Sequence, residues 1–472
     1  MISLTLSEIA SATAGKLTYV NDAQIVIDNI CTDTRNIQPG CLFLALQGAS
    51  FDAHDFLAEA KQAGAKALII HNKSQTSLPA VLVKDTRIAL GQLSAYVKSK
   101  IAHLKCAAIT GSNGKTTTKE LLSSILNAHS ASDAEDSVLA TAGNFNNDIG
   151  LPLTLLRLTE QTNFAVVELG ANHQGEIAYT ANLAKPDVAL INNVMPAHLE
   201  GFGSIEGVAK AKGEIWSSLT TEGTGVVNLD AKFAQDYVQQ LTKQQSQVFT
   251  FSQHDAKATV FASNIKFDDL GYATFTLNYA QNTVVISLNI AGKHNISNAL
   301  AAACMAIVLG CDLNTIHKGL ALVHQVAGRV NSCKVDEHLT LIDDTYNANS
   351  ASLKAAIDLL EQCSGEKTLI FADMGELGKY SEQEHRSVGE YAAEKEINNL
   401  FTVGSLTEFT HHAFTEKSLQ NALHFADKKA LTSYLQTYLP QISNQKSTVL
   451  VKGSRGTKME EIIAYIKQSK IG

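Results

Sequence analysis

The feature that most constrains this chain is a glycine-containing turn within residues 107–120, which read AAITGSNGKTTTKE. The apolar residues 107–109 predict a buried strand, and residues 117–120 predict the start of a helix. Gly111 and Gly114 carry no side chains where the backbone between these elements must pass close to a ligand. Because backbone N–H groups at such a turn and at a helix N-terminus attract anions, the segment predicts a phosphate-binding loop.

Two polar side chains of this loop have expected roles in nucleotide binding. Lys115 supplies a positive charge for the outer phosphates, and Thr116 supplies a hydroxyl for Mg²⁺. The spacing departs from the common P-loop pattern, because Ile109 stands where that pattern has its first glycine. The alternative is a glycine-rich turn with an incidental lysine. We favour nucleotide binding, because strand, glycines, lysine, threonine and helix occur together in the required order.

Length and composition indicate a globular protein of more than one domain. Its 472 residues exceed what one hydrophobic core usually supports, so two or three domains are expected. The net charge of −8 and the absence of a dense Lys/Arg run argue against nucleic acid as a partner. The seven cysteines include no CxxC pair, so neither a disulfide framework nor a zinc site is expected. Without a signal peptide or a membrane-spanning segment, we expect a cytoplasmic protein.

Alternating strands and helices predict an α/β protein of three domains. Residues 1–84 form a small N-terminal α/β domain, residues 85–326 a central P-loop-type domain with a mostly parallel sheet, and residues 327–472 a C-terminal Rossmann-like domain. Four parallel strands are expected in the central domain, at 107–110, 164–168, 188–192 and 225–228. Two antiparallel strands follow, at 274–277 and 283–290.

Polar residues follow three of these central strands, at the edge where a ligand of a parallel sheet binds. They are the amide-rich stretch GNFNNDIG at 143–150, Glu168 at the end of the strand AVVELG, and the stretch NNVMPAHLE at 192–200, which contains His198. A carboxylate at that edge is expected to hold Mg²⁺ beside the phosphate loop. The alternatives are turn-forming amides, a helix cap for Glu168 and a structural hydrogen bond for His198.

Together these motifs resemble the Mur ligase family of bacterial cell-wall synthesis. The residues that carry the resemblance span nearly the whole chain: TDTR (32–35), FDAHDF (51–56), TGSNGKTTT (110–118), GNFNNDIG (143–150), ELGANHQGEI (168–177), PAHLEGFGS (196–204), AKGEI (211–215), GKHNISNALAA (292–302), DDTYNAN (343–349) and KGSR (452–455). Within the family, GNFNNDIG with FDAHDF points to the member that joins D-Ala-D-Ala to UDP-MurNAc-tripeptide. The resemblance implies that ATP phosphorylates the tripeptide carboxylate and that the dipeptide amine then attacks the acyl phosphate.

The resemblance also implies roles for particular residues. Nucleotide binding is implied for Gly111, Ser112, Asn113, Gly114, Lys115, Thr116, Thr117, His294, Asn295, Asn298, Arg329 and Asp344. Binding of the UDP-substrate or of D-Ala-D-Ala is implied for Thr32, Asp33, Thr34, Arg35, Asn144, Asn147, Tyr346, Asn347, Asn349, Lys452 and Arg455. Catalysis is implied for Lys115, Glu168, His198 and Lys212, with two Mg²⁺ ions held by Thr116, Glu168, His198 and Lys212. Lys212 would act as a carbamate, because an unmodified ammonium would repel the metal.

Two alternatives stay open at this point. One is another amino-acid ligase of the same fold, such as a sibling Mur ligase or a folylpolyglutamate synthase. The other is a nucleotide switch without catalysis, in which ATP only moves the third domain. The sequence does not distinguish diaminopimelate from lysine as the third residue of the acceptor peptide. We expect a monomer whose domains open to admit substrates.

Overall fold

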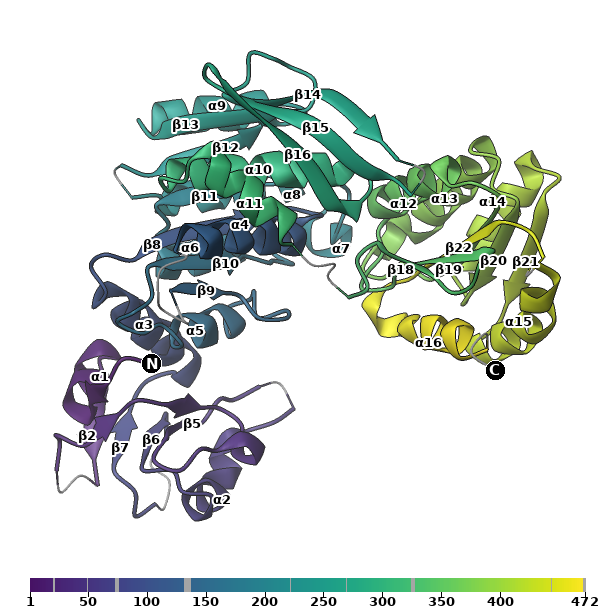
Figure 1. Ribbon diagram of the computed structural model, residues 1–472. Helices are drawn as coiled ribbons and strands as arrows, with labels where there is room; N and C mark the ends of the chain where they lie inside the picture. The colour runs from purple at the N-terminus through teal and green to yellow at the C-terminus, as the bar shows by residue number, and fades with distance from the viewer. Residues whose placement is uncertain are drawn as a thin grey trace.

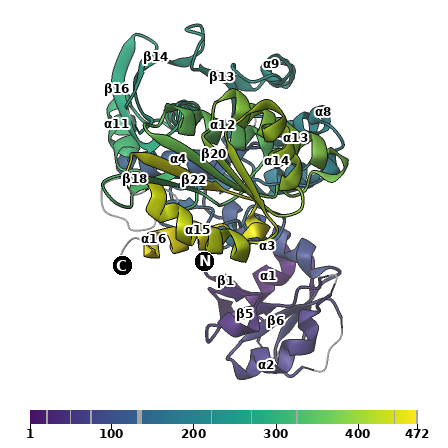
Figure 2. The ribbon, with the colours of Figure 1, turned by 90° about the vertical axis from the view of Figure 1, so that its right-hand side faces the viewer.

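Three main sheets organise the chain, one in each predicted domain, and a fourth sheet has only two strands (Figure 1). The computed structural model describes residues 1–19, 22–48, 50–72, 76–130, 137–220, 222–268, 270–323, 327–442 and 444–469. The predicted boundary at residue 326 lies outside these described residues, and both boundaries stay predictions. Figures 1 and 2 show the N-terminal domain at one end of the central domain and the C-terminal domain at its side. Among the described residues, no helix combines the length and apolar character that crossing a bilayer requires.

The N-terminal domain is built on a five-stranded sheet in the order β2-β7-β6-β5-β4. These strands are β2 (Lys16–Thr18), β4 (Ile30–Cys31), β5 (Leu42–Leu44), β6 (Ala67–Ile70) and β7 (Ala80–Leu82), and β1 (Leu4–Thr5) pairs with β3 (Val26–Ile27). Helix α1 (Leu6–Ala12) begins at a capping box formed by Thr5 and Glu8. Helix α2 (Leu57–Gln62) covers a small core of its own.

Helix α3 (Thr86–Ser99) connects the first two domains. Its buried residues Leu90, Leu93 and Val97 belong to one hydrophobic cluster that also contains Leu6 of α1 and Leu151 of α5 (Gly150–Leu155). Gly91 of α3 lies against α6 (Glu176–Ala184), because a Cβ at Gly91 would come within 2.3 Å of the Tyr179 hydroxyl. The first two domains therefore share a continuous apolar core.

The central domain carries a nine-stranded sheet in the order β16-β15-β14-β13-β12-β11-β8-β10-β9. Its strands are β8 (Lys105–Thr110), β9 (Val138–Ala140), β10 (Phe164–Glu168), β11 (Val188–Ile191), β12 (Thr224–Asn228), β13 (Gln247–Ser252), β14 (Val260–Phe267), β15 (Tyr272–Tyr279) and β16 (Asn282–Ala291). The sheet is parallel from β9 to β14, and β15 pairs antiparallel with both β14 and β16, as the sequence predicts.

Helices cover both faces of this sheet. One face carries α4 (Lys115–His129), α10 (His294–Val308) and α11 (Leu313–Ala321). The other face carries α5 (Gly150–Leu155), α6 (Glu176–Ala184), α8 (Ile205–Gly213) and α9 (Ala234–Lys243), and the short α7 (Leu199–Phe202) precedes α8. Helix α4 starts at Lys115, two residues before the predicted start, because Gly114 serves as its N-cap with φ +75°.

The C-terminal domain has a six-stranded sheet in the order β17-β18-β22-β19-β20-β21. These are β17 (Asn331–Lys334), β18 (Leu339–Asp344), β19 (Glu366–Ala372), β20 (Asn399–Val403), β21 (Asn421–Phe425) and β22 (Ser447–Lys452), and only the edge strand β17 is antiparallel among the described strands. Helices α12 (Ser350–Gln362), α13 (Ser381–Glu394) and α14 (Thr407–Lys417) pack on one face. Helices α15 (Lys428–Ile442) and α16 (Glu460–Gln468) pack on the other, which confirms the predicted doubly wound architecture.

Candidate active site

The phosphate loop lies where β8 ends and α4 begins, and its glycines are required there. Gly111 has φ +154° and Gly114 has φ +75°. A Cβ at Gly114 would come within 2.4 Å of Asn298 Oδ1, and one at Gly111 within 2.9 Å of Asn192 Cβ. Only glycine fits either position without displacing these neighbours.

A chain of buried amides fixes the shape of the loop. Asn192 Nδ2 donates to the carbonyl of Asn113 and to Asn298 Oδ1, both at 2.9 Å. Asn298 Nδ2 in turn donates to Asn295 Oδ1 at 2.8 Å, and Asn295 Nδ2 donates to the Ala291 carbonyl. Asn295 and Asn298, for which the resemblance implies adenine contacts, are thus buried and hold the loop from behind.

Asn193, which follows Asn192 in the sequence, holds the backbone of the loop at Asn113. Its Oδ1 accepts from the Asn113 N–H at 2.9 Å, and its Nδ2 donates to the Asn113 carbonyl. Ser112 is tied to the same segment, because its hydroxyl donates to the Met195 carbonyl at 3.0 Å. Neither Asn192 nor Asn193 is among the predicted site residues, although both follow the buried strand β11 directly.

Thr116 and Glu168 are in contact at the carboxyl-terminal edge of the central sheet. The Thr116 hydroxyl donates to Glu168 Oε2 at 2.7 Å, and both residues are buried. Lys115 Nζ donates to the Gly111 carbonyl at 2.8 Å across the loop. Burial lowers the pKa of Lys115, and nearby Arg329 lowers it further while Glu168 opposes the shift. The predicted pairing of a loop hydroxyl with a strand-end carboxylate is therefore present.

The amide-rich stretch 143–150 contributes a residue that the sequence analysis did not select. Asn146 Nδ2 donates to the other carboxylate oxygen of Glu168, Oε1, at 3.0 Å. Asn147 instead accepts, through its Oδ1, from the N–H of Gly150, the first residue of α5, at 2.8 Å, and Asn144 is exposed. Loop sequence alone does not show which of three neighbouring amides turns inward, because a loop has no fixed side-chain period.

Lys212 is buried in α8, with only 3% of its surface exposed. Burial lowers its pKa well below the usual value, and the nearby charge of Lys115 lowers it further. A lysine of this kind holds its amine in the neutral form at a pH where a surface lysine is an ammonium. The amine of Lys212 is therefore suited to react with an electrophile.

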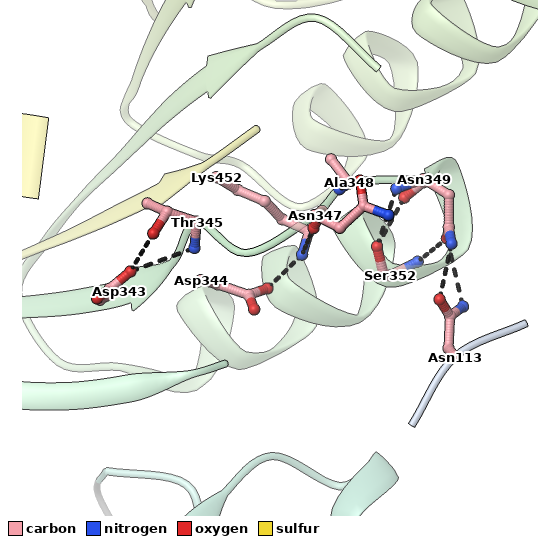
Figure 3. A network of polar contacts seen from close by, with 9 residues as sticks. All are labelled: Asn113, Asp343, Asp344, Thr345, Asn347, Ala348, Asn349, Ser352 and Lys452. Atoms are coloured by element: carbon pink, nitrogen blue, oxygen red, sulfur yellow. Dashed lines mark hydrogen bonds and ion pairs between the residues drawn. The ribbon is translucent and has the colours of Figure 1, made fainter. Parts of the chain in front are cut away.

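The C-terminal domain reaches the phosphate loop through two polar contacts. Arg329 Nη2 donates to the Thr116 hydroxyl at 2.9 Å, and the Arg329 guanidinium stacks 4.0 Å from the ring centre of Tyr346. Asn349 and Asn113 form a reciprocal amide pair, with distances of 2.7 and 3.3 Å (Figure 3). Asn349 is also the N-cap of α12, where its Oδ1 accepts from the Ser352 N–H. The C-terminal domain thus contacts two residues of the phosphate-loop segment, Asn113 and Thr116.

A buried ion pair lies behind these contacts (Figure 3). Lys452 Nζ lies 2.5 Å from Asp344 Oδ2 and donates to the Asn347 carbonyl at 3.0 Å. The pair joins the ends of the adjacent strands β18 and β22. Burial lowers the pKa of His294, which lies across the domain boundary and also feels the charges of Asp344 and Lys452. These three predicted residues are therefore brought near one another from two domains.

A third contact between the two domains joins His198 to Glu376. Their atoms Nδ1 and Oε2 lie 2.5 Å apart, and this contact lowers the pKa of the Glu376 carboxyl. The sequence analysis selects His198 but not Glu376. Glu376 lies in the stretch after β19, and nothing in that stretch indicates that its partner, His198, lies more than 170 residues earlier in the chain.

The predicted substrate residues of the N-terminal domain form a separate group. Arg35 has a side chain 86% exposed and pairs with Asp33 at 2.7 Å, which lowers the pKa of Asp33 to about 2. Thr32 and Thr34 are half-buried beside them, after β4. Among the described residues, no hydrogen bond or ion pair joins this group to the phosphate loop, whereas Arg455 does approach the Tyr346 ring, at 6.0 Å. In the part of the chain that the structure describes, these contacts therefore bring together the predicted site residues of the central and C-terminal domains, but not those of residues 32–35.

The motif FDAHDF serves the N-terminal fold. Asp52 caps the short helix at Ala53–Phe56, and the rings of Phe51 and Phe56 stack at 5.3 Å. His54 uses both ring nitrogens, with Nδ1 2.6 Å from Asp52 and Nε2 accepting from the His71 N–H at 3.1 Å. Both ring nitrogens of His54 are therefore engaged by Asp52 and by the backbone of His71.

The residues around the loop fit a nucleotide and a hard cation. Within the described part of the chain, the buried Nε of Arg329 has no hydrogen-bond partner, which suits an anionic phosphate. Glycine at positions 111 and 114 lets the loop pack directly against Asn192 and Asn298, which keeps its backbone free of side chains that would obstruct a phosphate. A hydroxyl and a carboxylate at 2.7 Å are oxygen donors of the kind that Mg²⁺ prefers.

Comparison with known proteins agrees along the whole chain. Three family profiles match it, described as "Mur ligase family, catalytic domain" over residues 26–104, "Mur ligase middle domain" over 109–306 and "Mur ligase, glutamate ligase domain" over 328–455. The UDP-N-acetylmuramoyl-tripeptide–D-alanyl-D-alanine ligase of Escherichia coli K12 is 43% identical over 99% of both chains.

Solved structures give the same result. A crystal structure of MurF from Acinetobacter baumannii covers 99% of each chain at 36% identity, with a TM-score of 0.92. MurF from Thermotoga maritima in complex with ADP covers 94% of this chain and 98% of its own, at 26% identity and a TM-score of 0.81. These matches confirm both the predicted α/β fold class and the resemblance found in the motifs. The chain belongs to the Mur ligase family.

Proposed function

We propose that this chain is an ATP-dependent ligase that joins D-alanyl-D-alanine to UDP-N-acetylmuramoyl-tripeptide and releases ADP and phosphate. The observation that carries the proposal is the group formed by Lys115, Thr116, Glu168 and Arg329. This group places the phosphate loop beside the hydroxyl of Thr116 and the carboxylate of Glu168. It lies where the C-terminal domain contacts the central domain through Arg329. The relatives that match over the whole chain have this activity in their names.

The reaction has to bring two anions together. A carboxylate oxygen of the tripeptide attacks the γ-phosphorus of ATP, ADP leaves, and an acyl phosphate forms. The amine of the dipeptide then attacks the acyl carbon, phosphate leaves, and the nitrogen loses a proton. The barrier to the first step is largely electrostatic, so the positive charges of Lys115 and Arg329 lower it by facing the γ-phosphate.

Magnesium would neutralise part of the phosphate charge. We assign one ion to Thr116 and Glu168, with Asn146 orienting the carboxylate through its 3.0 Å hydrogen bond. We assign a second ion to His198 and to Lys212 as its carbamate. The lowered pKa of Lys212 supports the modification, because only the neutral amine adds to CO₂.

Carbamylation of Lys212 is directly measurable. Protein equilibrated with ¹³C-labelled bicarbonate should show a carbamate carbonyl signal by NMR that is absent from the Lys212→Ala variant. An identical spectrum for both proteins would remove Lys212 from the metal site and leave the ligase proposal standing.

The remaining roles follow from position. We assign Thr32, Asp33, Thr34, Arg35, Asn144 and Asn147 to the UDP-substrate, and Tyr346, Asn347, Asn349, Lys452 and Arg455 to the wall where the dipeptide enters. For Asn147, Asn349 and Lys452 these roles would add to the structural contacts described above. We also propose that the enzyme works as a monomer in the cytoplasm.

The decisive experiment measures phosphate release from ATP with UDP-MurNAc-peptides of different lengths, each tried with L-amino acids, D-Glu and D-Ala-D-Ala. Release that requires the tripeptide and D-Ala-D-Ala together, with formation of the pentapeptide, is the expected result. Release with another pair would assign the chain to a sibling ligase. The Glu168→Gln variant should lose about a hundredfold in ligation rate. A nucleotide switch would close on ATP with no ligation to lose.

A further inference from the structure

The His198–Glu376 contact joins two domains at the edge of the proposed metal site. His198 precedes α7 of the central domain, and Glu376 lies in the loop after β19 of the C-terminal domain. A second bond supports the same boundary, since the Tyr380 hydroxyl donates to the Gly203 carbonyl at 3.2 Å. The short stretches 198–203 and 376–380, from different domains, therefore lie against each other at both ends.

Both partners of the pair have an unusual backbone. His198 has φ +53° and Glu376 has φ +61°, in the left-handed region that side chains other than glycine seldom adopt. Such conformations cost free energy, and in native proteins they cluster where a side chain must be aimed. Here two of them face each other across one 2.5 Å contact.

Glu376 is distinguished from the neighbouring acids by being turned toward the central domain. Asp373 accepts from the N–H groups of Leu406 and Thr407 at the start of α14, and Asp344 is paired with Lys452. Both of those carboxylates are used within the C-terminal domain. The Glu376 side chain is 59% exposed apart from its contact with His198.

We propose that Glu376 is a positioning residue that completes the metal site when the C-terminal domain docks. Its carboxylate lies 2.5 Å from Nδ1 of His198, which has no hydrogen bond in the described structure. A small turn of the ring would let the carboxylate accept the Nδ1 proton, which fixes the tautomer and leaves the Nε2 lone pair for a divalent cation. Carboxylate–histidine–metal arrangements of this kind orient the ring and raise its basicity. The inference rests on the proposed function, because it assumes that His198 is a metal ligand there.

The proposal has a consequence for the order of events. The carboxylate belongs to one domain and the histidine to another, so the second cation should bind tightly only in the docked arrangement. Docking, cation binding and assembly of the reactive centre are then one linked equilibrium.

The test is a double-mutant cycle read by metal binding. Mn²⁺ serves as the probe, and its affinity for the full-length protein is measured by electron paramagnetic resonance with a non-hydrolysable ATP analogue present. We expect Glu376→Ala to weaken the affected Mn²⁺ site about tenfold or more, in the range found for second-shell partners. His198→Ala should weaken it at least as much, and the double variant should be no weaker than His198→Ala alone.

Glu382→Ala is the matched control, because Glu382 is an exposed acid on the neighbouring helix α13. It removes the same charge and should leave Mn²⁺ binding unchanged. The proposal fails if Glu376→Ala behaves like Glu382→Ala, if His198→Ala binds Mn²⁺ normally, or if the two losses add in the double variant. A separate ligation assay on the unaltered protein tests the proposed function, so failure there is told apart from failure of the cycle.

Discussion

The two boundaries of the central domain differ in chemistry. Toward the N-terminal domain, α3 contributes Leu90 and Leu93 to an apolar core shared by both domains, with the exposed Lys100–Glu8 pair beside it. Toward the C-terminal domain, the contacts that reach the active site are polar: Asn113 with Asn349, Thr116 with Arg329, and His198 with Glu376. Apolar area is costly to expose to water, whereas a hydrogen bond is readily exchanged for one to water or to a ligand. The first boundary is therefore expected to stay closed. At the second, Ala291 and Tyr272 of the central domain also pack in the apolar cluster of the C-terminal domain, so the polar contacts beside the active site are the part expected to open.

The largest effect should come from Arg329, on the polar side. Arg329→Ala removes the guanidinium that contacts Thr116, and we expect the ligation rate to fall by about 10²–10³-fold, as for loss of a major electrostatic group. The free energy of unfolding should change far less, because no apolar core is opened. Steady-state kinetics and urea denaturation measure the two quantities. Arg386→Ala, which removes an arginine paired with Glu416 on the surface of the same domain, is the control and should affect neither.

The opposite pattern is expected on the apolar side. Leu93 is fully buried, so Leu93→Ala should lower the free energy of unfolding by about 2–5 kcal/mol. The molecules that stay folded should ligate at the normal rate. Ile88→Ala on the same helix tests specificity, because Ile88 is 52% exposed and its truncation should be nearly neutral. Loss of ligation without loss of stability in Leu93→Ala would contradict the division between the two boundaries.

The smallest expected effect concerns the amide pair. Asn349→Ala removes both the cap of α12 and the contact with Asn113, and should cost about 1 kcal/mol of stability. It should also increase the radius of gyration measured by small-angle X-ray scattering without nucleotide, because the C-terminal domain docks less often. Ser352→Ala weakens the same cap but keeps the amide pair. An equal expansion in both variants would show that the cap, and not the contact between domains, controls docking.

Much of the fold could be predicted from the sequence, because periodicity and glycine placement act locally. The strand ending at Thr110 and the following phosphate loop are set by neighbouring residues, and so is the switch to antiparallel strands after β14. The pairing of Thr116 with Glu168 also follows from local pattern, since the phosphate loop that leads to Thr116 follows the carboxyl end of β8 and Glu168 ends the adjacent parallel strand β10.

The missed residues depend on contacts that no local pattern encodes. Asn146 differs from Asn144 and Asn147 only in the direction that an irregular loop gives its side chain. Glu376 acquires its partner only when two separately folded domains meet. Asn298, for which the resemblance implies nucleotide binding, also uses its amide to hold the loop, since a polar group in a buried helix must be satisfied.

The strand order of the C-terminal sheet has a consequence for synthesis of the chain. Strand β22 lies between β18 and β19, so the middle of that sheet is made of residues that are translated after all its other described strands. Until Ser447–Lys452 emerges, β18 and β19 lack their shared neighbour and Asp344 lacks its lysine. The first two domains can fold during translation, while the third must wait for this last strand of its sheet. A nascent or truncated product would therefore present a formed phosphate loop with no domain able to close over it.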